Sequence, residues 1–304
     1  MEYRAFGNTG LEVSRLGVGM SELGFELSMK DIEQASRVLN SALDHGINLL
    51  DTAACYGIAE ELIGRCVSGR RDDFILSTKC GHVPTGYKGE DWTAKTVAES
   101  VDRSLERMKT DHIDIVHLHS CSVEILERGE VIGALQAAKR AGKTRLIAYS
   151  GDNDAVEWAV RSGLFDSIQT SINLVDQRAR TRVLPAALKA GLGVIAKRPI
   201  ANGVWQAEES PSEYAAAYFE RATAMLARGT IEHGWNEEPH PVQLALGYVL
   251  SLPGVSTAII GTKNPAHMIT NIQHLASISD FSTQIVEELN RRFDTLGADW
   301  PQLT

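Results

Sequence analysis

The chain of 304 residues lacks the paired cysteines of a disulfide framework. Its four cysteines stand at positions 55, 66, 80 and 121, and no C-x-x-C pair is present. This number and spacing argue against structural disulfides in a chain of this length. We therefore expect a reducing, cytoplasmic location.

Long apolar runs and an excess of positive charge are also missing. No run reaches the roughly 18 apolar residues of a membrane-spanning helix, and the opening MEYRAFGNTG has no apolar core of a secretory signal. With 30 Lys and Arg against 39 Asp and Glu, the formal net charge is −9. We expect no membrane and no nucleic-acid partner, while a local basic site for one anionic cofactor is still allowed.

The chain does contain a regular alternation of two kinds of segment. Eight short runs rich in Ile, Val and Leu lack strict polar alternation, which is typical of parallel strands buried on both faces. These runs cover residues 15–19, 47–51, 74–79, 113–119, 145–150, 167–172, 193–198 and 256–261. Segments with helical periodicity lie between them, at residues 32–45, 60–67, 94–108, 131–141, 155–161, 178–190, 242–250 and 265–275.

This alternation predicts an α/β fold, a (β/α)8 TIM barrel that forms one domain over residues 1–304. A doubly wound sheet is the alternative, but Gly17-Val18-Gly19 after the first strand continues without a G-x-G-x-x-G phosphate turn. Residues 80–92, residues 199–239 (with a helical stretch at 213–227) and a tail from position 281 with one more helix exceed ordinary connections. The first two follow strand ends, where a barrel places its active site.

Four ionisable side chains follow adjacent predicted strands. Asp51, Lys79 and His119 end the second, third and fourth strands, and Tyr56 lies just beyond the second. Each has an ordinary structural explanation when taken alone: a helix cap, a solvated lysine, a packed histidine or a packed tyrosine. Together they form a proton donor, because an ammonium stabilises phenolate and lowers the pKa of a tyrosine. The carboxylate keeps the lysine charged, and the histidine can hydrogen-bond a carbonyl oxygen.

At these residues the sequence resembles the aldo-keto reductase superfamily over nearly its whole length. The opening FGNTGLEVSRLGVG is similar to the family's N-terminal hairpin and first strand, and GINLLDTAACYGIAEELIG, ILSTKCG and HIDIVHLHS are similar to its catalytic segments. The resemblance implies a catalytic tetrad of Asp51, Tyr56, Lys79 and His119. It also implies hydride transfer from NAD(P)H to an aldehyde or ketone, with Tyr56 as the general acid.

The resemblance also implies a nicotinamide site with two departures from the family pattern. Ser150 and Gln169 match residues that hold the carboxamide, but Gly151 replaces the usual asparagine, for which Asp152 or Asn153 could substitute. Lys197 stands where the family has a stacking tyrosine. We expect Lys197 and Arg198 to offset pyrophosphate charge. The other candidate cofactor residues of this part of the site are Ile200, Asn202 and Gly261.

The segment AIIGTKNPAHMITNI is similar to the family's adenosine-phosphate site. It reads as a loop followed by a helix N-terminus, with Asn264 as the cap. Thr262 and Lys263 lie where the family meets a 2′-phosphate, His267 replaces a frequent arginine, and Asn271 matches the asparagine near the adenine. Lys263 favours NADP(H), and NAD(H) is the alternative.

Aromatic residues of the long loops and the tail are the predicted walls of the substrate pocket. They are Tyr87, Trp92, Trp205, Trp235 and Trp300. Because pockets are lined mainly by apolar and aromatic side chains, they indicate a small apolar or aromatic carbonyl substrate.

Three other functions are compatible with parts of the pattern. His117 and His119 lie on one face of a strand, and with Asp51 they could hold zinc for hydrolysis, although no further ligand cluster joins them. Lys79 could form a Schiff base, but a lysine beside a carboxylate stays charged, which disfavours this role. Some relatives within the family bind the cofactor as regulatory subunits of membrane channels. We predict no metal.

Overall fold

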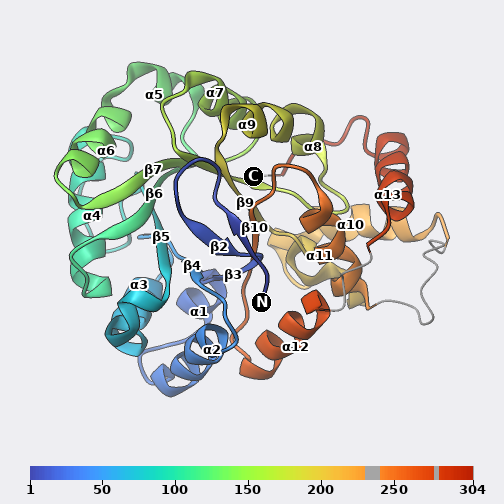
Figure 1. Cartoon of the computed structure of the whole chain (residues 1–304), viewed down its shortest axis with the longest axis horizontal. Coiled ribbons are helices and arrows are strands. Elements are labelled where there is room, and N and C mark those ends of the chain that lie inside the picture. Colours follow the sequence, from blue (N-terminus) through green and yellow to red (C-terminus); the bar gives the residue numbers. More distant parts are fainter. Residues whose placement is uncertain (230–239, 277–280, 304) are drawn as a thin grey trace.

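The computed structural model describes residues 1–229, 240–276 and 281–303. Eight parallel strands close into a barrel in the order β10-β3-β4-β5-β6-β7-β8-β9, with helices around the outside (Figure 1). The strands are β3 (Leu16–Gly19), β4 (Leu49–Asp51), β5 (Ile75–Cys80), β6 (Ile113–His119), β7 (Thr144–Ser150), β8 (Ser167–Ser171), β9 (Gly193–Lys197) and β10 (Thr257–Ile260). All eight predicted strands and the (β/α)8 barrel are confirmed.

The predicted helices are also present, with one break. They are α2 (Ile32–Asp44), α3 (Ala59–Cys66), α4 (Ala94–Met108), α6 (Glu130–Arg140), α7 (Asn153–Ser162), α8 (Arg178–Arg182), α9 (Leu184–Ala190), α10 (Ala216–Leu226), α11 (Pro241–Ser251), α12 (Pro265–Ala276) and α13 (Thr283–Leu296). The helix expected over 178–190 is divided between α8 and α9. Pro185 provides no N–H for the helical hydrogen bond to the carbonyl four residues earlier, and its ring crowds that carbonyl, which accounts for the break.

Two short helices were not predicted, α1 (Ser21–Glu26) and α5 (Val123–Arg128). Helix α1 packs tightly against the turn that follows β4. A Cβ at Gly24 would collide with the carbonyl oxygen of Tyr56, so only glycine permits this approach. The N–H of Ile58 donates to the carbonyl of Gly24 at 3.2 Å. Helix α1 therefore holds the backbone that carries Tyr56.

An N-terminal hairpin of β1 (Tyr3–Ala5) and β2 (Glu12–Ser14) closes one end of the barrel. Phe6 and Val13 of this hairpin are fully buried and pack with Leu49, Ile115 and Ile195 of the barrel interior. A second apolar layer lies between the sheet and the helices; α2, for example, buries residues at helical spacing. With one end plugged by the hairpin, the carboxyl ends of the strands are the open end.

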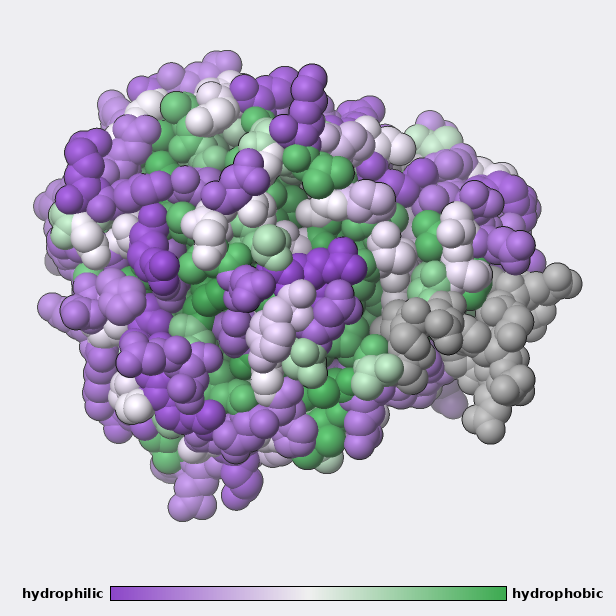
Figure 2. Space-filling model, in the orientation of Figure 1, coloured by the Kyte–Doolittle hydropathy of each residue, from purple (hydrophilic) through white to green (hydrophobic). Residues whose placement is uncertain are grey.

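The outer surface is mixed in character. On the face shown in Figure 2, hydrophilic side chains cover most of the outer helices and hydrophobic residues lie between them toward the middle. In the described part of the chain, no helix combines the length and the apolar character needed to cross a bilayer.

The C-terminal tail, residues 297–303, is tied to the barrel by hydrogen bonds. Gln302 donates to the carbonyl of Ser171 at 2.8 Å, and the N–H of Leu303 donates to Asp176 Oδ2 at 3.0 Å. Asp176 also accepts from the Tyr218 hydroxyl at 3.1 Å, whereas its Oδ1 is buried and has no partner in the part of the chain that the structure describes. Burial raises the pKa of Asp176 to about 7.

This buried carboxyl predicts a pH dependence of stability. A carboxyl whose pKa is higher in the folded than in the unfolded state favours folding below its unfolded pKa, and this contribution is lost as the pH rises toward 7. Asp176→Asn should therefore raise the melting temperature relative to wild type at pH values above about 7, and the difference should shrink as the pH falls toward 4. Thermal unfolding across this range measures it. A variant that is equally destabilised at every pH would contradict the assignment.

Candidate active site

The four predicted catalytic side chains meet at the open end of the barrel. Lys79 Nζ donates to Asp51 Oδ2 at 2.6 Å and to the carbonyl of Thr52 at 2.8 Å. Lys79 lies 4.9 Å from the centre of the Tyr56 ring, and the rings of Tyr56 and His119 are 5.6 Å apart. Asp51 and Lys79 are almost fully buried, whereas Tyr56 and His119 are half-buried at the cavity. The structure thus assembles the residues that the sequence placed on separate strands.

Strand pairing accounts for this arrangement. In the β4–β5 register Asp51 lies opposite Ser77, and in the β5–β6 register Lys79 lies opposite His117. Since residues two positions apart on a strand share a face, the side chains of Ser77 and Lys79 project together into the barrel beside Asp51. The turn after β4 continues the same surface, with the N–H of Ala54 donating to the carbonyl of Lys79 at 3.1 Å.

The electrostatics of the cluster keep its groups in definite protonation states. Burial lowers the pKa of the Lys79 ammonium, but Asp51 and then Tyr56 outweigh it, so the pKa lies above its ordinary value. Burial raises the pKa of the Tyr56 phenol, and the charge of Lys79 offsets only part of this effect. The predicted net lowering of the Tyr56 pKa is therefore wrong for this structure. Burial, and to a smaller extent the charge of Lys79, holds the pKa of His119 well below its ordinary value.

His117 serves a different purpose from His119. It is completely buried, and its Nε2 lies 3.1 Å from Ser77 Oγ, which in turn donates to Asp51 Oδ1 at 2.7 Å. Burial lowers the pKa of His117 to about 4. His117 thus helps to hold Oδ1 of Asp51 in place through the Ser77 hydroxyl. Within the described residues, no group of three or more His, Cys, Asp or Glu side chains is arranged to hold a metal ion.

A cavity of about 700 Å³ opens beside the cluster. It is lined by Asp51, Tyr56 and His119, and by seven of the residues predicted to contact the cofactor. These are Ser150, Gln169, Lys197, Arg198, Ile200, Asn202 and Gly261. Its volume is within the range of cofactor and ligand sites.

Two amide groups in this cavity have unused hydrogen-bond donors. Gln169 accepts from the Ser150 hydroxyl at 3.0 Å through Oε1, while its Nε2 is buried and has no partner among the described residues. The same holds, within the described part of the chain, for Nδ2 of Asn202. Because buried donors are almost always satisfied in native proteins, these two groups indicate a polar ligand. A nicotinamide carboxamide beside Gln169 and Ser150 fits this donor set.

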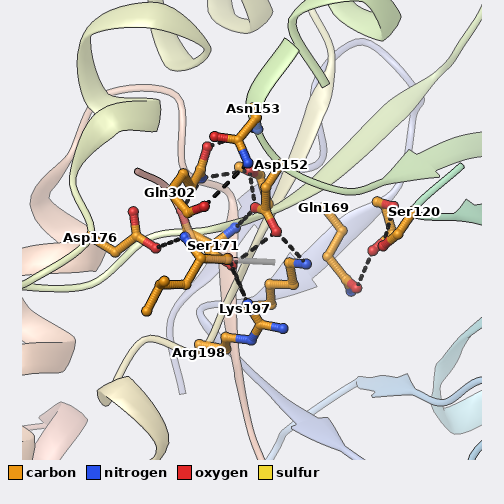
Figure 3. A network of polar contacts seen from close by, with 12 residues as sticks. Ser120, Asp152, Asn153, Gln169, Ser171, Asp176, Lys197, Arg198 and Gln302 are labelled. Atoms are coloured by element: carbon orange, nitrogen blue, oxygen red, sulfur yellow. Dashed lines mark hydrogen bonds and ion pairs between the residues drawn. The ribbon is translucent and has the colours of Figure 1, made fainter. Parts of the chain in front are cut away.

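The two adjacent cations have hydrogen-bond partners within the protein, and one of them, Lys197, has an ionic partner (Figure 3). Lys197 Nζ lies 2.8 Å from Asp152 Oδ2. Arg198 donates to Ser171 Oγ at 3.1 Å and to the carbonyl of Leu303 at 2.8 Å, and it also contacts the Tyr214 hydroxyl. Burial lowers the pKa of Lys197 although Asp152 opposes this. The charge of Lys197 is therefore largely balanced before any anion binds.

The carboxamide substitutes suggested from the sequence lie elsewhere. Asp152 points to Lys197 and accepts from the N–H of Ser171 at 2.7 Å, and the Asn153 side chain donates to the carbonyl of Gln302 at 3.2 Å. Neither lines the cavity. The suggestion that one of them replaces the missing asparagine is wrong for this structure. Asp152 is held by Lys197 and Ser171, and Asn153 is held by Gln302 of the C-terminal tail.

The residues expected around the adenosine phosphate lie at the β10–α12 connection. Asn264 Oδ1 accepts from the N–H of Ala266 at 2.9 Å, as predicted for a cap. Thr262 is buried, His267 is exposed and Asn271 is half-buried. The Lys263 ammonium forms an ion pair with Glu26, and the backbone N–H of Lys263 donates to Glu22 Oε1 at 3.1 Å. Two carboxylates of α1 therefore lie beside the one lysine of this loop.

Four of the five predicted aromatic wall residues are described, and none of these four lines the cavity. Trp92 packs against His82, with ring centres 4.6 Å apart, and Tyr87 lies under Arg103 and Arg107. Trp205 is buried in the core, Trp300 packs on Phe293, and Trp235 lies outside the described residues.

The aromatic lining of the cavity comes from residues that sequence reasoning missed. Besides Tyr56, it consists of Phe25 and Tyr214, both largely exposed. The ring of Phe25 lies 5.8 Å from that of Tyr56. Phe25 belongs to the short helix α1, which periodicity did not predict. Tyr214 lies at the start of the predicted helical stretch 213–227, but periodicity does not show which side chains of that stretch face the cavity.

Comparisons with known proteins agree with the fold. The model of the "Aldo/keto reductase family" matches residues 15–291. L-galactose dehydrogenase of Arabidopsis thaliana is 32% identical over 90% of this chain and 87% of its own length. A solved aldo-keto reductase of Bacillus halodurans in its holo form superposes with a TM-score of 0.82 at 26% identity, covering 96% of both chains. A probable voltage-gated potassium channel subunit beta of Oryza sativa subsp. japonica is 26% identical over 95% of both chains.

A buried carboxylate–lysine pair thus lies beneath a tyrosine at the open end of a (β/α)8 barrel. The chain belongs to the aldo/keto reductase family. Members of this family generally use NAD(P)H and act on small carbonyl compounds.

Proposed function

We propose that this protein reduces an aldehyde or ketone to the alcohol with NADP(H) as the preferred cofactor and Tyr56 as the general acid. The observation that carries the proposal is the buried Lys79–Asp51 pair beneath the Tyr56 ring, at the wall of a cavity that also presents His119. The unpartnered Nε2 of Gln169 supports a carboxamide in the same cavity. When bound, the cofactor supplies hydride to the carbonyl carbon.

The protein's own groups act on the carbonyl oxygen. Tyr56 keeps its proton at neutral pH because burial raises the pKa of its phenol, so it is ready to donate a hydrogen bond and then the proton. Lys79 beside the ring stabilises the phenolate that remains, and Asp51 holds Lys79 in place. The His119 imidazole is neutral and donates a second hydrogen bond to the carbonyl oxygen of the substrate. Donors aimed at developing charge in a site with little water can each contribute several kcal/mol.

The cofactor preference rests on Lys263. Its ammonium is half-exposed at the loop that precedes α12, where the N-terminal turn of a helix favours phosphate. Glu26 competes with a phosphate for this charge. Fluorescence titration with NADPH and NADH in parallel tests the proposal, with tighter binding of NADPH as the expected result. Binding of neither cofactor would contradict it.

The pairing of Lys263 with Glu26 gives a prediction with opposite signs for the two residues. Lys263→Met should raise the Kd for NADPH about fivefold, because an exposed charge contact contributes about 1 kcal/mol. Glu26→Gln should lower that Kd, since it frees the ammonium. The Kd for NADH is the internal control and should change little in either variant. Equal changes in the Kd values for NADPH and NADH would show that Lys263 does not contact the 2′-phosphate.

A further inference from the structure

Cys55 contacts a ring nitrogen of the candidate catalytic histidine. It precedes Tyr56 in the turn after β4 and is half-buried. Its Sγ lies 3.4 Å from Nδ1 of His119, at the end of β6. Sulfur is large, so this separation is within hydrogen-bond range for a thiol.

The other neighbours of His119 leave its two ring nitrogens with distinct surroundings. The rings of Tyr56 and His82 approach it edge-on, each with centres 5.6 Å away, and contribute packing. Among the described residues, Cys55 is the one hydrogen-bond partner of the imidazole, and Nε2 has none. His119 also lines the cavity, so Nε2 is the ring nitrogen left for a ligand.

The direction of the hydrogen bond follows from the protonation states. Burial raises the pKa of the Cys55 thiol although Lys79 opposes it, so the sulfur keeps its hydrogen. Burial lowers the pKa of His119, so the imidazole is neutral and carries one hydrogen. An imidazole lone pair accepts far better than a thiol sulfur, which makes the S–H the donor and Nδ1 the acceptor.

We propose that Cys55 is a positioning residue whose thiol donates to Nδ1 of His119 and thereby keeps the imidazole hydrogen on Nε2. The mechanistic consequence rests on the proposed function. The Nε2–H tautomer donates a hydrogen bond to the carbonyl oxygen, whereas the opposite tautomer would direct a lone pair at it. The contact thus selects the form of His119 that assists reduction.

Two substitutions separate this role from simple packing. Cys55→Val removes the donor and keeps an apolar side chain of similar size, and Cys55→Ser keeps a donor. Cys66→Val is the matched control, because Cys66 is also half-buried but its sulfur faces the carbonyl of Ile32, away from the cavity. Nitrogen NMR on protein with isotope-labelled histidine reports the tautomer directly, and a His119→Gln variant assigns the signal.

The wild type, Cys55→Ser and Cys66→Val are expected to show His119 with its hydrogen on Nε2, and Cys55→Val to show a mixture of tautomers. The ratio of the two tautomers should change about fivefold in Cys55→Val, because one neutral hydrogen bond biases an equilibrium by about this factor. The kcat for carbonyl reduction should fall in proportion to the lost fraction of the Nε2–H form, and it should recover in Cys55→Ser. An unchanged His119 signal in Cys55→Val would overturn the proposal. Absence of turnover in the wild type would count against the proposed function, and the NMR comparison, which needs no substrate, would still decide the role of Cys55.

Discussion

Replacing Tyr56 with phenylalanine is expected to lower kcat for carbonyl reduction by at least about 100-fold, the usual scale for removal of a general acid. The ring would still fill its place between Phe25 and His119, so the cavity keeps its shape. The hydroxyl alone is lost, and with it the proton that the developing alkoxide needs. The Kd for the cofactor should change little, because the donors predicted to hold it belong to other residues. Steady-state kinetics and fluorescence titration measure the two quantities.

Tyr214→Phe is the matched control for this substitution. Tyr214 also lines the cavity, but its hydroxyl contacts Arg198 and not the Lys79–Asp51 pair. We expect its kcat to stay within a few-fold of wild type. Turnover like that of the wild type in Tyr56→Phe, or an equal loss in both variants, would remove Tyr56 from the role of the acid.

Breaking the buried pair should affect both stability and activity. Asp51→Asn leaves the Lys79 ammonium without a counter-charge in a site that is almost fully closed to water. Removal of one partner of a buried pair costs about 3–5 kcal/mol in the free energy of unfolding. Activity should fall as well, because Lys79 would no longer be held beside the Tyr56 ring. Chemical denaturation and initial rates give the two readings.

The pH dependence of the Asp51→Asn variant has a definite sign. Without the carboxylate, burial dominates and the folded-state pKa of Lys79 falls below its unfolded value, so the unfolded state binds more protons. Stability of the variant should then rise as the pH increases toward the ordinary lysine pKa of about 10.4. The wild type should lack this rise, because the folded-state pKa of Lys79 lies above its ordinary value.

The double variant Asp51→Asn, Lys79→Met separates charge from packing. It removes both charges, so most of the lost stability should return while activity stays low. A single Asp51→Asn variant as stable as wild type at neutral pH would contradict the view that the pair is buried and ionised.

The barrel was predictable because its strands are buried on both faces. Runs such as 113–119 and 145–150 are apolar without alternation, and the strands β6 and β7 coincide with them to within one residue. The division of the helix over 178–190 had a signal in Pro185 that periodicity alone did not use. Helix α1 spans six residues and contains Gly24, so its sequence is too short to show a helical periodicity.

The candidate catalytic cluster was predictable for a related reason. Side chains at the carboxyl ends of adjacent parallel strands must converge, so Asp51 and Lys79 could be paired without coordinates. The pairing of Lys197 with Asp152 could not be predicted in this way. Asp152 follows β7, and β8 lies between β7 and β9 in the barrel. The prediction of aromatic walls was wrong for the four described residues, Tyr87, Trp92, Trp205 and Trp300. The path of a long loop depends on what it packs against, which sequence spacing does not reveal.

The most direct test of the central claim is to follow the transferred hydrogen. The purified protein is mixed with an aromatic aldehyde and with NADPH that carries deuterium at its transferable position, and the product is analysed by mass spectrometry. We predict an alcohol with one deuterium on the former carbonyl carbon, at a rate that collapses in Tyr56→Phe. Tight cofactor binding without deuterium in any alcohol product would contradict the claim and would point to a protein that binds the cofactor for a regulatory purpose.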